Sequence, residues 1–197
     1  MTLTIGFVSG FLVADDSMLA AYDESFEKYN IEHGNFTLSS EASESTIKKI
    51  EEKGDVRLCK NFYRDESVDT DLDGTENGTI RIYQDRTDMD LVCLMKGEMP
   101  QAKNEIAIDR MYADNNSLTV GDKIKVGGEE LSITGLIALS DYSCLFSNNS
   151  DMMFDAVKFG VAIMTEEGAD QFGTTHLEYR YSWQYANEPK DDIEAKN

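Results

Sequence analysis

Residues 120–134 read VGDKIKVGGEELSIT, a run in which polar and apolar residues alternate on both sides of a glycine pair. Alternation with a period of two is typical of a β-strand that buries one face. Two successive glycines supply the positive φ angles that a two-residue type I′ turn requires. The stretch therefore predicts a β-hairpin that turns at Gly127 and Gly128, and its second strand continues through the apolar residues 136–139.

Further short strands are predicted on both sides of this hairpin. Residues 105–109 and 159–164 are short and largely apolar, and residues 79–84 alternate. Residues 91–95 form a continuous apolar run, which is typical of a buried strand. Residues 176–185 give the clearest signal, because a leucine and four aromatic residues at alternate positions share one face and polar residues hold the other.

A β-α-β unit is predicted nearer the start of the chain. Residues 35–39 and 55–63 read as strands, and residues 41–53 between them place isoleucines on one helical face. Two strands joined in this way lie parallel when they belong to one sheet. A further helix is predicted over residues 17–29, where apolar and aromatic residues recur at helical spacing.

The charge of the chain limits the partners that it can bind. Its 197 residues include 18 lysines and arginines against 38 aspartates and glutamates, a formal net charge of −20. Such a surface repels phosphate backbones, so we expect no nucleic-acid partner, whereas cationic peptides and metal ions are attracted. The alternative interpretation is that the charge only keeps the domain soluble.

An acidic stretch, residues 65–78, is rich in turn-forming residues and predicts a loop. Within it, Asp69, Asp71 and Asp73 are followed by Gly74, which matches the first half of an EF-hand calcium loop. These three carboxylates are the candidate metal ligands of the chain, and calcium is the expected ion.

The second half of the EF-hand pattern is missing. An EF-hand has a bidentate carboxylate at its twelfth position. Here that position is Ile80, which the predicted strand places in the core. Calcium would then need Glu66 or Glu76 as a further ligand, and the alternative is an ordinary solvated acidic turn.

No catalytic constellation is visible in the sequence. The two histidines, His33 and His176, belong to no HExxH motif and to no cluster with cysteine. The three cysteines include no CxxC pair. A GxSxG elbow, a P-loop and a GxGxxG motif are all missing from the sequence. We therefore predict no catalytic residues and no enzymatic activity.

Four stretches occur in an order that resembles a known family. They are GEMP at residues 97–100, EIAID at 105–109, LTVGDKIKV at 118–126 and FGVAI at 159–163. In this order they resemble the extracytoplasmic core domain of FtsX-like (MacB-type) ABC-transporter permeases. The shared residues are turn glycines, a proline and core strand positions.

The resemblance implies an α+β fold with a porter-like β-α-β subdomain and an inserted β-rich subdomain. The porter-like part would comprise residues 35–99 and 156–186, and the insert residues 100–155. Residues 1–34 would be a helical segment that follows a membrane helix. Residues 187–197 would be a linker toward the next membrane helix.

The resemblance also implies a function at the extracytoplasmic side of the cell membrane. Such a domain couples ATP-driven movement of the membrane helices to export or to an extracytoplasmic partner. ATP would be hydrolysed by an ABC ATPase subunit that acts through the membrane part of the permease. A permease dimer and a lipid, peptide or protein substrate are the other partners implied.

The irregular stretch 140–155 is the candidate surface for contacts with such a partner, because loops on a rigid scaffold often carry recognition. Its candidate contact residues are Asp141, Tyr142, Asn149 and Asp151. The alternative for this stretch is a solvated crossover between subdomains.

Two other functions stay open at this point. A secreted acidic module that binds calcium or cationic peptides would use the charge and the acidic loop. A hydrolase that uses paired carboxylates is the third hypothesis, although no constellation of residues supports it.

Overall fold

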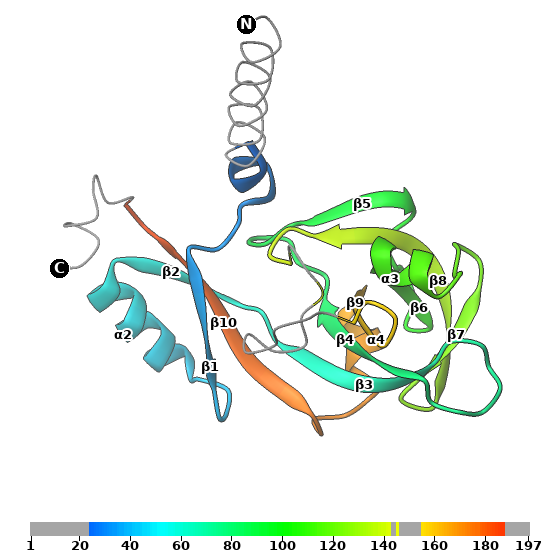
Figure 1. Ribbon diagram of the computed structural model, residues 1–197. Coiled ribbons are helices and arrows are strands. Elements are labelled where there is room, and N and C mark those ends of the chain that lie inside the picture. Colours follow the sequence, from blue (N-terminus) through cyan, green and yellow to red (C-terminus); the bar gives the residue numbers. More distant parts are fainter. Residues whose placement is uncertain (1–23, 143–144, 146–154, 188–197) are drawn as a thin grey trace, which may run out of the picture.

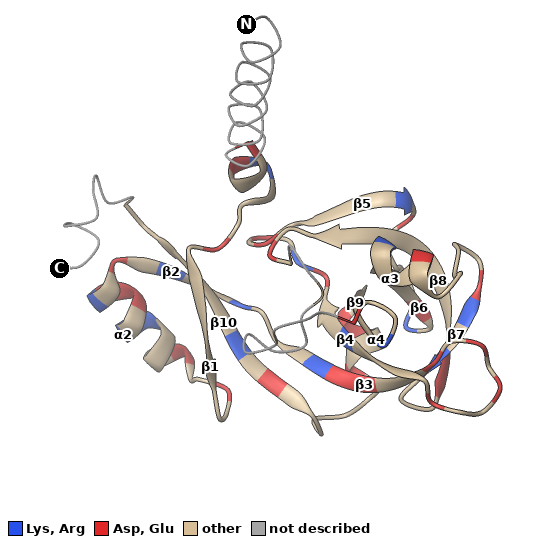
Figure 2. Cartoon of the chain, viewed as in Figure 1, with Lys and Arg blue, Asp and Glu red and all other residues tan. Residues whose placement is uncertain are grey.

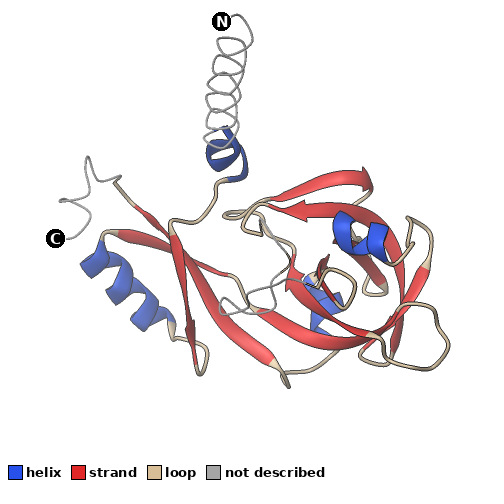
Figure 3. Ribbon diagram, viewed as in Figure 1, coloured by secondary structure: helices blue, strands red, loops and turns tan. Residues whose placement is uncertain are grey.

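The computed structural model describes residues 24–142, residue 145 and residues 155–187 (Figure 1). The described strands are β1 (Gly34–Leu38), β2 (Val56–Lys60), β3 (Tyr63–Asp69), β4 (Gly78–Gln84), β5 (Val92–Gly97), β6 (Glu105–Asp109), β7 (Lys123–Val126), β8 (Glu129–Leu139), β9 (Phe159–Met164) and β10 (Leu177–Tyr185). The helices are α2 (Glu44–Gly54), α3 (Arg110–Asn115) and α4 (Glu166–Asp170), and residues 24–29 are also helical. Strands dominate and helices make up a smaller share (Figure 3), so the predicted mixed α+β class is confirmed.

Six strands close on themselves. β3 pairs with β4, β4 with β9, β9 with β6, β6 with β8, β8 with β7, and β7 returns to β3. We call this closed sheet the strand ring. Its buried residues form one continuous apolar core that includes Ile80, Ile106, Ile124, Ile133 and Val161. Each strand of the ring is hydrogen-bonded to a ring strand on both sides, so the ring is a closed sheet without a free edge.

A second, smaller sheet has the order β1-β10-β2. Both outer strands run antiparallel to β10, so β1 and β2 are parallel to each other, as the β-α-β prediction required. The connecting helix α2 begins at Ser43, whose side chain accepts a hydrogen bond from the Thr46 N–H. α2 packs beside β2 at the edge of the molecule (Figure 1).

β10 belongs to both sheets. Its first residues, Leu177 and Glu178, pair with β3 of the strand ring. Its remaining residues pair with β1 and β2. One strand therefore joins the small sheet to the strand ring.

The hairpin and most of the predicted strands are confirmed. Gly127 and Gly128 have φ angles of 54° and 92°, and Val126 pairs with Glu129, as a type I′ turn requires. The preceding Gly121 also has a positive φ, 102°, where the chain turns into β7. The motif residues in this region thus have structural roles.

Three expectations were wrong. The single strand predicted over residues 55–63 is two strands, and the second, β3, extends into the predicted loop as far as Asp69. Burial explains the extension of β3, because Val68 and Asp69 are 0% and 3% exposed. β5 is an edge strand that leaves Leu94 and Met95 half-exposed, so it is not buried on both faces. The short helix α3 was not predicted.

The pairing of β4, β9 and β6 can be compared with the predicted division into subdomains. β4 and β9 come from the two expected halves of the porter-like part, and they pair with each other. β9 also pairs with β6, which comes from the expected insert. The division into residues 35–99 with 156–186 and residues 100–155 stays a prediction.

α3 is held against β9 by a contact between Tyr112 and Gly160. The Tyr112 side chain is fully buried, and a Cβ atom at Gly160 would lie 2.5 Å from its Cγ. Only glycine leaves room for this ring, which explains a glycine in the middle of a buried strand. Among the described residues, no helix is both long and apolar enough to cross a bilayer.

Candidate functional site

The chain enters the domain through residues 29–33, which we call the entry segment. The His33 N–H donates to Trp183 O over 2.9 Å. The Tyr185 N–H in turn donates to Nδ1 of His33 over 3.2 Å. The point where the chain enters the body and the point where β10 leaves it therefore lie side by side.

The entry segment is held from two sides. On the β10 side, Nε2 of Gln184 donates to Oδ1 of Asn30 and to the backbone oxygen of Ile31, both over 2.9 Å. On the other side lies the β4–β5 connection, residues 85–91. Two of its backbone N–H groups, one of them that of Asp90, donate to backbone oxygens of the entry segment over 3.0 and 2.8 Å. The segment is thus a strap fixed to both parts of the molecule.

The alternation in β10 explains how it serves two surfaces. On one face Tyr181 is buried and stacks on Phe36, with ring centroids 5.6 Å apart. The opposite face carries Arg180, Ser182 and Gln184, which hydrogen-bond to the entry segment and its surroundings. The predicted polar face of this strand therefore points into a buried junction and not into solvent.

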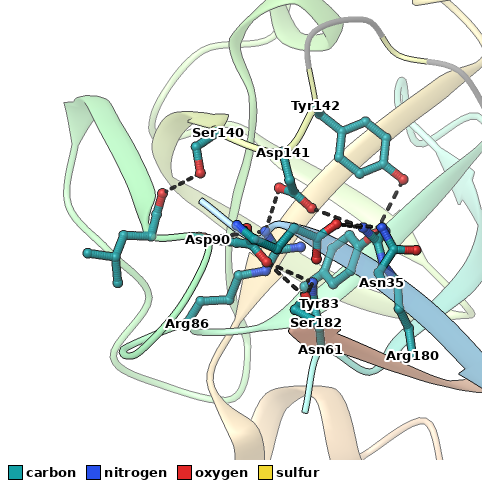
Figure 4. Close-up of polar contacts among 12 residues, drawn as sticks. Asn35, Asn61, Tyr83, Arg86, Asp90, Ser140, Asp141, Tyr142, Arg180 and Ser182 are labelled. Carbon is teal, nitrogen blue, oxygen red and sulfur yellow. Dashed lines mark hydrogen bonds and ion pairs between the residues drawn. The ribbon is translucent and has the colours of Figure 1, made fainter. Parts of the chain in front are cut away.

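Asp90 lies at the centre of this junction and is 1% exposed. Its carboxylate accepts hydrogen bonds from the Glu32 N–H over 2.8 Å, from Ser182 Oγ over 2.9 Å and from Asn61 Nδ2 over 3.4 Å. These donors belong to the entry segment, to β10 and to the turn between β2 and β3 (Figure 4). One carboxylate thus connects three separate parts of the chain.

Two buried arginines join the same junction. Arg86 forms an ion pair of 2.6 Å with Asp141, and their side chains are 5% and 2% exposed. Arg180 lies 3.6 Å from Asp141 and 2.9 Å from Glu32. We call Glu32, Arg86, Asp90, Asp141 and Arg180 the junction network, and Figure 4 labels the last four of these residues.

The junction network contains three carboxyl groups and two guanidinium groups. Burial, together with repulsion from Asp141 and Glu32, raises the pKa of Asp90 to about 7, although the Glu32 N–H and Arg86 act against this rise. With Asp90 protonated, the buried charges of the network balance. The net charge of the junction network is thus closest to zero when the Asp90 carboxyl group is protonated.

A chain of polar contacts continues from the junction network into the strand ring. Arg180 Nη1 donates to the Tyr83 hydroxyl over 3.3 Å, and this hydroxyl lies 3.3 Å from that of Tyr142. Arg81 donates to the Tyr142 hydroxyl over 2.9 Å and to both carboxylate oxygens of Asp65 over 2.7 and 2.8 Å. The contacts reach from the entry segment to β3 and β4. Figure 2 shows the charged residues of β3 and β10 along this path.

A cleft of about 330 Å³ opens beside the junction network. It lies between β2 with its following turn and the β4–β5 connection. Its lining includes Asp85, Asp88 and Asp90, and also Lys60 and Cys59. Displacement of the β4–β5 connection would change the shape of this cleft.

The predicted contact residues lie in different surroundings. The Asp141 carboxylate points inward and is bound by two arginines, so its charge stabilises the junction and is not displayed on the surface. Tyr142 is half-buried, and its hydroxyl accepts a hydrogen bond from Arg81. Asn149 and Asp151 lie outside the described residues, and a partner contact there stays a prediction.

The predicted calcium ligands do lie together. One carboxylate oxygen from each of Asp69, Asp71 and Asp73 lies within 4.8 Å of the others. Ile80, at the twelfth position of the pattern, is fully buried, as expected.

Neither of the two further acids considered as ligands joins this group. Glu76 accepts a hydrogen bond of 2.6 Å from Ser67 Oγ. Glu66 lies 4.0 Å from Nε of Arg64, and its side chain is 13% exposed. The acidic loop thus offers three protein carboxylates and no more from the residues that the sequence suggested.

The sequence did not reveal the junction network. Arg180 and Ser182 were assigned to the polar face of β10, but alternation cannot distinguish water from a buried polar junction on the far side. Glu32, Arg86 and Asp90 lie in connections without periodicity. Their only sequence signal is the placement of single charges among turn residues, which is common on any surface.

Comparison with known proteins gives a structural likeness only. No protein family and no curated protein matches the chain. Its structure is similar to the extracellular domain of the noncanonic ABC-type transporter YknZ from Gram-positive bacteria, with a TM-score of 0.47, 13% identity and coverage of 84% of this chain and 87% of that one. It is also similar to the periplasmic region of MacB from Actinobacillus actinomycetemcomitans, with a TM-score of 0.44, 6% identity and coverage of 77% and 68%. Both structures are domains that lie outside the cytoplasmic membrane, the kind of domain that the sequence motifs resemble.

Proposed function

We propose that this chain is the extracytoplasmic domain of an ABC-transporter permease at the cell membrane. In this proposal it couples ATP-driven movement of membrane helices to export or to a partner outside the cytoplasm. The observation that carries the proposal is the pairing of entry and exit, through the hydrogen bonds that link His33 with Trp183 and Tyr185. A domain placed between two membrane helices needs both connections at one end of its body.

The junction network supports a coupling role. The entry segment is hydrogen-bonded to β10 and to the β4–β5 connection, which belong to different parts of the molecule. Packed interiors transmit displacement because they deform little. A pull on the entry segment would therefore act on the small sheet, on the strand ring and on the cleft between β2 and residues 85–91 together.

The partners follow from this role. ATP would be hydrolysed by an ABC ATPase subunit, reached through the membrane part of the permease. Residues 1–34 would follow one membrane helix and residues 187–197 would lead to the next. A second permease copy and a lipid, peptide or protein substrate belong to the same proposal. The net charge of −20 argues against nucleic acid.

Cysteine labelling in intact cells tests the location. Val157 is 52% exposed and is a suitable site for Val157→Cys, in a background where Cys59, Cys93 and Cys144 are serine. In cells that produce the full natural protein, we expect a membrane-impermeant maleimide to label this cysteine before lysis, and the labelled protein to be found in the membrane fraction. The same background with Val157 unchanged is the control.

Two other outcomes of the labelling experiment would contradict the proposal. Labelling that appears only after lysis would refute the extracytoplasmic location. Labelled protein in the medium would support the alternative, a secreted acidic module for calcium or cationic peptides.

A further inference from the structure

The acidic loop at the end of β3 contains a buried carboxylate oxygen without a hydrogen-bond partner. Asp69 is only 3% exposed. Its Oδ2 accepts a hydrogen bond of 2.9 Å from the Gly74 N–H, but Oδ1 is buried and has no partner within the described residues. Leaving a buried charged oxygen unpaired is costly, and in folded proteins such atoms usually face a donor, a water molecule or an ion.

Two exposed carboxylates lie beside this oxygen. Asp71 and Asp73 each bring a ligand oxygen within 4.8 Å of the others. Three like charges at this separation repel one another unless a cation lies between them. Lys125 is opposite Asp69 in the pairing of β3 with β7, but its side chain is exposed and forms no ion pair with Asp69 in the described structure.

The spacing suits calcium. Calcium binds oxygen ligands at about 2.3–2.6 Å, so two ligands on opposite sides of the ion are about 5 Å apart. The three carboxylate oxygens lie within that limit. Gly74 follows in the sixth position of the loop with a φ of 91°, which makes the sharp turn that an EF-hand loop also makes there.

We propose that Asp69, Asp71 and Asp73 bind one calcium ion at the tip of the β3–β4 hairpin. The loop is the one at the far end of β3 in Figure 1, away from the entry segment. Backbone carbonyl groups and water complete the coordination, because the twelfth position is the buried Ile80. Without a bidentate glutamate, the affinity falls in the range of extracellular calcium modules, a Kd of about 10⁻⁴–10⁻³ M.

Calorimetric titration of the 197-residue chain with calcium chloride tests the site. We expect one saturable site, and at least a tenfold loss of affinity in Asp71→Asn, because this exposed residue supplies one of the three charged ligand oxygens. Glu52→Gln, on the exposed face of α2, changes the net charge equally and should leave the affinity unchanged. Magnesium chloride should bind at least tenfold more weakly, since magnesium demands a tighter octahedral site.

Thermal unfolding provides a second readout. Ten millimolar calcium is expected to raise the Tm of the parent chain and of Glu52→Gln by about 3–10 °C, and that of Asp71→Asn by much less. Circular dichroism without calcium should be the same for all three proteins, which shows that the variants fold. Saturable binding that is equally strong in both variants would refute the site, as would no saturation up to 10 mM calcium. Neither result would affect the proposed transporter role.

Discussion

The carboxyl group of Asp90 gives the junction a dependence on pH. Its pKa is about 7 in the folded protein and about 4 in an unfolded chain. Between these values the folded state holds a proton that the unfolded state has already released. The free energy of unfolding therefore falls as the pH rises from about 4 to 7, by up to about 1.4 kcal/mol per pH unit from this group.

Asp90→Asn should remove this dependence. An amide can replace the protonated acid, because Asn61 Oδ1 is buried without a partner in the described structure and can accept a hydrogen bond. We expect the free energy of unfolding of Asp90→Asn, relative to the parent, to increase by about 1–3 kcal/mol between pH 5.5 and pH 8. Urea unfolding across this pH range measures it. Asp88→Asn, two residues away and exposed, is the control. If the free energy of unfolding changed with pH in the same way in the parent and in Asp90→Asn, the pH dependence would not come from Asp90.

The contact between Gly160 and Tyr112 is a second residue-scale constraint. Gly160→Ala would place a methyl group 2.5 Å from the Tyr112 ring, closer than van der Waals contact allows. Overpacking of a buried site of this kind costs about 1–3 kcal/mol. Urea unfolding measures the loss, and combination with Tyr112→Ala provides the control. In the Tyr112→Ala background, Gly160→Ala should lower the free energy of unfolding by much less. An equal loss in both backgrounds would show that the Tyr112 ring is not the reason for glycine at this position.

At the scale of elements, the strap formed by the entry segment depends on Gln184. Gln184→Ala removes two hydrogen bonds between β10 and the segment. We expect amide hydrogen exchange at Glu32 and His33 to become about thirtyfold faster, since the two lost bonds contribute about 1 kcal/mol each to local stability. Gln171→Ala also removes a side chain that donates to a backbone oxygen, that of Lys103, but outside the junction. If both variants left Glu32 and His33 equally protected, Gln184 would not be what fixes the strap.

Regular elements could be predicted from the sequence where periodicity and turn chemistry agree. The β7–β8 hairpin follows from alternating residues around Gly127 and Gly128, and β10 from its aromatic stripe. The β-α-β unit followed from a helix between two apolar runs. In each case local pattern and tertiary environment impose the same structure.

The failures have a different physical origin. The sequence predicts a loop from residue 65 onward because Asp65, Glu66 and Asp69 interrupt the strand pattern. In the structure Asp65 pairs with Arg81, and Asp69 caps the following turn. The consecutive apolar residues of β5 predict a buried strand, but its place at the edge of the sheet leaves one side free. The calcium ligands were named from their spacing, whereas the junction network depends on contacts between residues up to 148 positions apart.

At the scale of the whole molecule, the two sheets differ in resistance to deformation. The strand ring has its member strands paired on both sides, whereas the small sheet ends in β1 and β2, each paired on one side only within the described part of the chain. Displacement of the entry segment is therefore expected to bend the small sheet and the junction before it deforms the ring. The cleft beside the junction network lies where the two parts meet.

The sharing of β10 has a consequence for how the chain is assembled. β1 and β2 do not pair with each other, and both take β10 as their partner. All six ring strands lie between residues 63 and 164, whereas β10 begins at Leu177. During synthesis from the N-terminus, the strands of the ring are complete while β1 and β2 still lack the strand between them. The part of the molecule made first is thus the part whose native sheet is completed last.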